Sequence, residues 1–132
     1  MKKINQEARY YETNEWVTVQ NNIFTIGITD FAQTVFGTVA KINLPKVGEF
    51  IEKHKELVTI ESDKALTEVE SPLSGKIISI NDNLKNNPNW LNESPYEKGW
   101  LVKMEIKDHS NWEELMSSSD YKNYMNIFYN KV

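Results

Sequence analysis

The residue with the clearest chemical potential in this chain is a lysine that lies between two β-rich runs. Val58 and Ile60 precede it, residues 67–69 follow it, and a polar turn separates the two runs: Glu61, Ser62, Asp63, Lys64 and Ala65. A turn of this kind holds the lysine amine away from the protein body, where a modifying enzyme can reach it. Placement alone is weak support, because most turn lysines are simply solvated. Lys64 is therefore a candidate attachment site that needs support from the rest of the chain.

Other kinds of chemistry have little support in the residue inventory. The chain has no cysteine, which excludes disulfides, thiolate catalysis and thiolate metal sites. The two histidines, His54 and His109, lack metal-ligand spacing, so we predict no metal site and interpret both as surface residues. There is also no glycine-rich phosphate loop. This inventory predicts a protein that is not an enzyme.

Charge and hydropathy exclude two classes of partner. The 132 residues carry a net charge of −4 with a pI of about 5.2, and no basic patch stands out, so we expect no nucleic acid. The N-terminal lysines are not followed by an apolar run, which predicts neither a secretory signal nor a membrane span. We therefore expect one soluble, intracellular domain, in the cytoplasm of a bacterium or in the mitochondrial matrix of a eukaryote.

Several short elements are predicted around the lysine turn. Residues 16–19 and 23–28 read as a hairpin closed by Asn21 and Asn22. Asp30 as a cap and Gly37 as a stop frame a short helix over residues 31–36. Alternation over residues 38–44 predicts a strand with Ala40, Ile42 and Leu44 on its buried face. Together with residues 76–80 and 100–106, the pattern gives about seven short strands.

The remaining segments are a long loop and a helical tail. Residues 81–99 are rich in asparagine and contain two prolines, which predicts a surface loop with at most one helical turn. Ser110 and Glu113 form a capping box, and the tail after it should be a helix packed by an aromatic stripe: Tyr121, Tyr124, Met125 and Phe128. The four tryptophans are interpreted as core and rim packing. The fold class is mainly β: a small sandwich or flattened barrel of two antiparallel sheets with short helices and a C-terminal helix.

The lysine turn and four other groups of residues resemble one family. The turn, followed by Ser71, Pro72 and Gly75, is similar to a lipoyl-attachment segment, and residues 45–49 are similar to the entry segment of biotinyl and lipoyl domains. Residues 14–17, 27–33 and 94–101 resemble the glycine cleavage H protein in particular. The resemblance extends from about residue 11 to residue 124. It implies that residues 11–132 form a lipoyl-carrier domain with a C-terminal helical segment, after an N-terminal tail of residues 1–10.

The resemblance also implies a function for the lysine. Lipoic acid would be attached covalently to Lys64 by a lipoyl ligase or a lipoyl/octanoyl transferase, which would recognise the hairpin residues Glu61, Ser62, Asp63 and Ala65. The arm would shuttle the aminomethyl intermediate of glycine between three enzymes. They are a glycine decarboxylase that uses pyridoxal phosphate, an aminomethyltransferase and dihydrolipoyl dehydrogenase. A short tether supports such transport, because it gives an effective concentration on the order of millimolar at each partner site.

Three residues are expected to shield the loaded arm. The resemblance places Thr13, Glu15 and Glu68 at a cleft beside the hairpin, where carboxylates would hold the cationic amine and the cleft would slow its loss to water. Each of them taken alone is equally well interpreted as a solvated polar residue.

Asp63 leaves a second function open. The residue before the lysine is usually small and apolar in H proteins, whereas Asp63 resembles the lipoyl domains of 2-oxo acid dehydrogenase acyltransferases. The alternative is therefore a lipoyl donor or storage carrier for those complexes. His54 also occupies a turn position where the family often has glycine, which predicts either a different local geometry or a strained backbone there.

Overall fold

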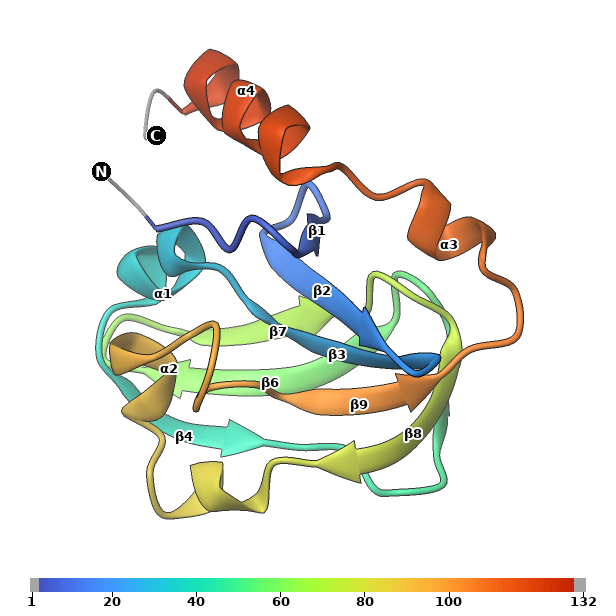
Figure 1. Cartoon of the computed structure of the whole chain (residues 1–132). Coiled ribbons are helices and arrows are strands. Elements are labelled where there is room, and N and C mark those ends of the chain that lie inside the picture. Colours follow the sequence, from blue (N-terminus) through green and yellow to red (C-terminus); the bar gives the residue numbers. More distant parts are fainter. Residues whose placement is uncertain (1–2, 130–132) are drawn as a thin grey trace.

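The computed structural model describes residues 3–129 and shows two antiparallel sheets (Figure 1). The larger sheet has the order β1-β2-β3-β9-β8-β5, and the smaller has the order β4-β6-β7. The strands are β1 (Arg9–Tyr10), β2 (Glu15–Gln20), β3 (Ile23–Ile28), β4 (Val39–Asn43), β5 (Phe50–Ile51), β6 (Glu56–Ser62), β7 (Leu66–Glu70), β8 (Gly75–Ile80) and β9 (Val102–Glu105). The predicted mainly β class of two small sheets is confirmed. The described residues hold nine strands rather than about seven, because β1 and β5 have only two residues each.

The predicted first hairpin is present as β2 and β3. Its register pairs Gln20 with Ile23, which leaves a two-residue turn. Asn21 and Asn22 have φ angles of 52° and 62°, the left-handed conformation that asparagine tolerates better than most residues.

The strand at residues 38–44 differs from its predicted alternation. Val39 and Ile42 of β4 are buried, but Ala40 is exposed. A register shift between Val39 and Lys41 marks a β-bulge against β6, which breaks the two-residue period. The prediction of Ala40 on the buried face was therefore wrong.

The helices lie at the rim of the sheets: α1 (Asp30–Phe36), the 3₁₀ helix η1 (Asp82–Lys85), α2 (Trp90–Glu93), α3 (Ser110–Glu113) and α4 (Ser118–Phe128). The helix at residues 31–36 is confirmed as α1, but its cap is Thr29, whose hydroxyl accepts from the Ala32 N–H. Asp30 instead accepts from the Gln33 side chain at 2.8 Å. The loop at residues 81–99 has η1 and the short α2 where one helical turn was expected.

The predicted tail helix is interrupted. Ser110 is the first residue of the one-turn α3, and the N-cap position is held by His109 without a side-chain bond, so the capping box was wrong. The main helix, α4, begins one residue after Ser117, whose hydroxyl accepts from the Asp120 N–H. Tyr121 and Met125 are buried as expected, whereas Phe128 is 67 % exposed. The stripe therefore packs only along the first part of α4.

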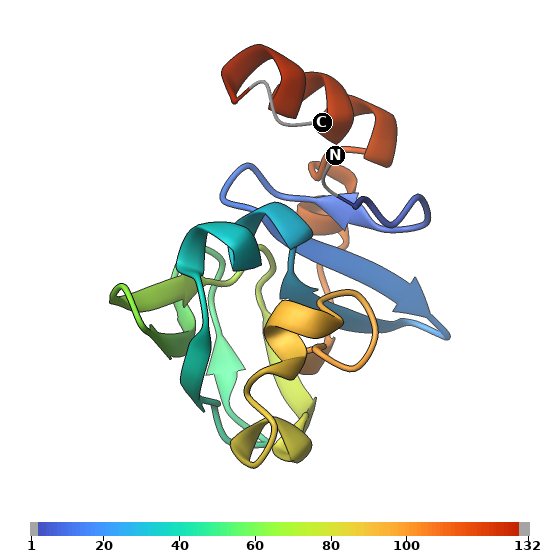
Figure 2. The ribbon, with the colours of Figure 1, turned by 90° about the vertical axis from the view of Figure 1, so that its left-hand side faces the viewer.

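The N-terminal segment and α4 pack on each other above the larger sheet (Figures 1 and 2). The rings of Tyr10 and Tyr121 stack with centroids 4.2 Å apart, and Tyr10 also exchanges backbone hydrogen bonds with Met116. Ala8 and Tyr10 are buried. These residues were assigned to an N-terminal tail, but the aromatic stack and the β1–β2 pairing make them part of the packed structure.

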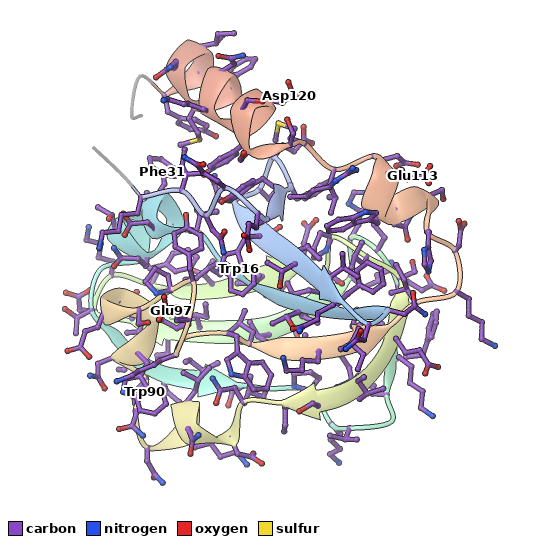
Figure 3. The ribbon with its side chains drawn as sticks, in the orientation of Figure 1. Trp16, Phe31, Trp90, Glu97, Glu113 and Asp120 are labelled. Atoms are coloured by element: carbon purple, nitrogen blue, oxygen red, sulfur yellow. The ribbon has the colours of Figure 1, made fainter. Side chains whose placement is uncertain are left out.

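Two apolar clusters hold the fold together. The larger contains core residues from both sheets, and the smaller joins Tyr10 of β1 and Trp16 of β2 to Tyr121 of α4. Figure 3 shows Trp16 inside the molecule and Trp90 at the periphery on α2. Trp16 is 2 % exposed and its Nε1 donates to the Pro95 carbonyl at 3.0 Å, which satisfies its polar atom.

Candidate functional site

Lys64 lies at the exposed tip of the β6–β7 hairpin, as predicted. The strands pair from Glu56 and Glu70 at one end to Glu61 and Leu66 at the other, so the turn has a paired base. The Ser62 N–H donates to the Ala65 carbonyl at 2.9 Å, and the Ser62 hydroxyl donates to the same carbonyl at 3.2 Å. These bonds close the turn locally and leave the lysine side chain outside it.

The tip is also held from outside the hairpin. The Asp63 N–H donates to the Thr38 carbonyl at 3.0 Å, which joins the turn to the segment after α1. Gly37, at the end of α1, has a φ of 78°, and a Cβ there would lie 2.5 Å from Asp63 Oδ1 and 3.3 Å from Lys64 Cε. The sequence identified Gly37 only as a helix stop, but the structure shows that it also lets the tip approach the helix.

The other predicted recognition residues surround this tip. Glu61 and Ala65 are exposed, as is Asp63, while Ser62 is partly buried by its role in the turn. Next to them, Leu66 is 67 % exposed, an unusual position for a large apolar side chain. The turn therefore presents an amine, two acids and an apolar side chain in a few residues.

Of the three predicted cleft residues, the structure joins two. Thr13 donates a short hydrogen bond to Glu15 Oε1, and Glu15 begins β2 with only 3 % of its surface exposed. Glu68 lies on β7, opposite Thr59 in the register, with its side chain exposed. Glu70, on the same exposed face two residues further along β7, is the acid whose charge affects Glu15. Glu70 was not predicted as a cleft residue, although its place in the alternation along β7 was a signal for it.

Burial changes the ionisation of Glu15. It raises the pKa of this carboxyl to about 8; the Thr13 hydrogen bond opposes this rise in part, and the negative charge of Glu70 adds a smaller rise. Glu15 is therefore largely protonated at neutral pH. The sequence suggested that Glu15 and Glu68 are both ionised, but Glu15 is mainly neutral.

His54 and Tyr11 form a further contact beside Glu70. The Tyr11 hydroxyl and His54 Nδ1 are 3.0 Å apart, and His54 Nδ1 lies 3.8 Å from Glu70 Oε1. His54 has a φ of 73°, so the predicted strain at this turn is confirmed. The rings of His109 and Phe24 are nearly perpendicular, with centroids 5.5 Å apart. Across residues 3–129, no group of three or more His, Cys, Asp or Glu residues is arranged to hold a metal ion.

Comparison with known proteins decides the family. The family model described as "Glycine cleavage H-protein" matches residues 8–128. The chain belongs to the glycine cleavage H-protein family. This confirms the resemblance drawn from the lysine turn and the segments around it.

Similar proteins agree with this assignment. A glycine cleavage system H protein of Halalkalibacterium halodurans is 43 % identical over 122 residues, covering 92 % of this chain and 95 % of the relative. The H protein of Staphylococcus epidermidis is 42 % identical over 115 residues, covering 87 % of this chain and 91 % of the relative. The crystal structure of a glycine cleavage system H protein from Mycobacterium marinum superposes with a TM-score of 0.81 at 24 % identity, covering 92 % of this chain and 98 % of that one. That likeness shows a shared fold.

No helix among residues 3–129 is long and apolar enough to cross a membrane.

Proposed function

We propose that Lys64 carries a covalently attached lipoyl group and that this protein is the non-catalytic lipoyl carrier of a glycine cleavage system. The observation that carries the proposal is the exposed Lys64 on a turn whose backbone is fixed by Ser62 and by Thr38. A carrier needs this combination, because the arm must be free to move while its base keeps a defined position. Family membership supports the same role.

The residues near Lys64 fit a lipoyl group. An attachment site needs a reachable amine, and the Lys64 side chain is exposed. Leu66, Glu68 and Glu70 alternate along the exposed face of β7, so an apolar side chain comes first and two acids follow. The same face leads toward Glu15 and Thr13, since Glu70 is close enough to raise the Glu15 pKa. We propose this face and the Thr13–Glu15 pair as the shielding cleft, with Glu70 as an added member.

When bound, the lipoyl group supplies a reversible disulfide that takes up and releases an aminomethyl unit from glycine. The proposed partners are a glycine decarboxylase, an aminomethyltransferase, dihydrolipoyl dehydrogenase, and the ligase or transferase that loads Lys64. Hairpin recognition by that loading enzyme is assigned to Glu61, Ser62, Asp63 and Ala65. The named relatives are bacterial, which supports the bacterial cytoplasm as the proposed location.

The attachment is tested with lipoate, ATP and a lipoate–protein ligase, followed by intact-mass measurement and peptide mapping. We expect one lipoyl group, on Lys64, and none on the Lys64→Arg protein. A second modified lysine, or an unmodified Lys64, would contradict the proposal.

The glycine cleavage role needs a separate assay. The lipoylated protein is incubated with glycine and a glycine decarboxylase, and reduction and aminomethylation of the arm are measured. We expect both to occur. A carrier that is lipoylated but inert here, and that passes its lipoyl group to a 2-oxo acid dehydrogenase domain, would instead be the donor that Asp63 suggests.

A further inference from the structure

The side-chain amide of Asn92, on α2, joins two segments close to the lysine hairpin. Its Nδ2 donates to the Gly37 carbonyl at 2.7 Å and to Gln33 Oε1 at 3.0 Å, and its Oδ1 accepts from the Val39 N–H at 2.9 Å. A backbone carbonyl can only accept and a backbone N–H can only donate, so these partners fix the orientation of the amide. Both amide hydrogens and the oxygen of Asn92 are therefore hydrogen-bonded to the segment that runs from α1 to the start of β4.

One of these bonds leads directly to the hairpin. The Val39 N–H and the Thr38 carbonyl belong to the same peptide group, which is planar and places them on opposite sides. Asn92 holds the N–H side at 2.9 Å, and the Asp63 N–H donates to the carbonyl side at 3.0 Å. Asn92 and the residue next to Lys64 are therefore linked through a single rigid peptide. Hydrogen bonds in such a chain polarise and strengthen one another.

The bond to Gly37 acts on the same contact. Gly37 is the position where an added Cβ would meet Asp63 and Lys64, so its placement decides how closely the tip approaches α1. Asn92 holds the carbonyl of Gly37 and the N–H of Val39, on either side of Thr38. The hairpin side of this segment is held by the Asp63 N–H and by the pairing of Val39 with Ser62. Asn92 holds its other side.

We propose that Asn92 is a positioning residue for the Lys64 hairpin: it orients the Thr38–Val39 peptide that anchors the Asp63 N–H. The proposal rests on the proposed function, in which Lys64 is the residue that is lipoylated. Asn92 acts through the backbone of residues 37–39 and does not touch the lysine. Its loss leaves the strands β6 and β7 paired but frees the tip.

The test measures amide hydrogen exchange by NMR on the unlipoylated protein, so it does not depend on the modification. In Asn92→Ala, we expect exchange at Asp63 to be about fivefold to tenfold faster, as expected for one lost hydrogen bond. Exchange at Ile60, fully buried in β6, should stay as in the parent. Asn92→Asp keeps an acceptor for Val39 but loses the donor to Gly37, so its effect on Asp63 should be smaller. The matched control is Asn89→Ala, an exposed asparagine whose side chain contacts Glu93, with no expected change at Asp63.

The functional readout is lipoylation by a lipoate–protein ligase with lipoate and ATP. We expect kcat/KM for Asn92→Ala to fall about fivefold, since the ligase must order a freed tip, and to stay at the parent value for Asn89→Ala. Unchanged Asp63 exchange in Asn92→Ala, equal acceleration at Asp63 and Ile60, or equal effects of the Ala and Asp variants would overturn the positioning role. If Asn92→Ala does not fold, Asn92→Leu replaces it, because leucine keeps the side-chain volume and makes none of these hydrogen bonds: unchanged Asp63 exchange in that variant overturns the role. A parent protein that is not lipoylated would refute the proposed function instead.

Discussion

Glu15 should make the stability of this protein depend on pH. Burial raises the pKa of its carboxyl from 4.5 to about 8, so between these values the folded state holds a proton that the unfolded chain has released. The stability that this proton confers is fully present below pH 4.5 and is lost as pH rises through the folded pKa. The loss follows a slope of about 1.4 kcal/mol per pH unit between the two pKa values and levels off above the folded one. From pH 6 to pH 9 it amounts to about 3 kcal/mol.

Glu15→Gln removes the ionisable group and keeps an acceptor for the Thr13 hydroxyl. The free energy of unfolding of both proteins would be measured by urea denaturation at several pH values between 5.5 and 9. We expect the parent to lose about 3 kcal/mol relative to the variant over this range, because other titrating groups are common to both and cancel. Tyrosines with raised pKa values, such as Tyr121, are avoided by stopping at pH 9.

Glu12→Gln is the matched control, since Glu12 is an exposed carboxyl close to Glu15 in the sequence. It should keep the pH dependence of the parent. Parallel curves for the parent and Glu15→Gln would refute the reasoning, because they would mean that Glu15 has the same pKa in the folded and unfolded states. A parent curve that rises with pH relative to the variant would mean that the carboxylate is stabilised by a partner.

Three further outcomes are expected. Lys64→Ala should change the free energy of unfolding by less than about 0.5 kcal/mol, as is typical of exposed positions, and abolish lipoylation; a loss of several degrees in Tm would show that Lys64 is structural. The double variant Glu15→Gln with Glu68→Gln should release formaldehyde and ammonia from the loaded carrier faster than the parent, with unchanged lipoylation; equal rates would remove the acids from the cleft. Gly37→Ala should lower stability by about 1–3 kcal/mol in urea, because its φ of 78° and its contact with Asp63 both oppose a Cβ.

Local patterns in the sequence were sufficient for the hairpins. The asparagine pair at residues 21–22 adopts the predicted left-handed turn, and the polar turn at residues 62–65 lies between paired strands. Each of these features depends on residues within a few positions of one another. The alternation at Ala40 failed because a bulge is set by pairing with β6, which is not visible in the β4 segment alone.

Contacts between distant segments were not accessible in this way. Tyr10 and Tyr121 stack across most of the chain length, so no local pattern assigns Tyr10 to the packed structure. The bonds of Asn92 to Gly37 and Val39 span more than fifty residues, and an asparagine in a loop rich in asparagine gives no sign of them. The ionisation of Glu15 depends on its burial and on Glu70, neither of which its own sequence neighbours specify.

A protonated Glu15 is consistent with a cleft for a cationic amine. A buried carboxylate without a positive charge beside it costs several kcal/mol, so the protein without cargo is more stable with this group neutral. An ammonium group beside Glu15 would oppose the effects of burial and of Glu70, and would lower the pKa of the carboxyl toward its usual range. The acid would then release its proton as the cation arrives, and the ion pair would form only in the loaded state. Under the proposed function, the Glu15 carboxyl would therefore be neutral beside an empty arm and charged beside an arm that carries the amine.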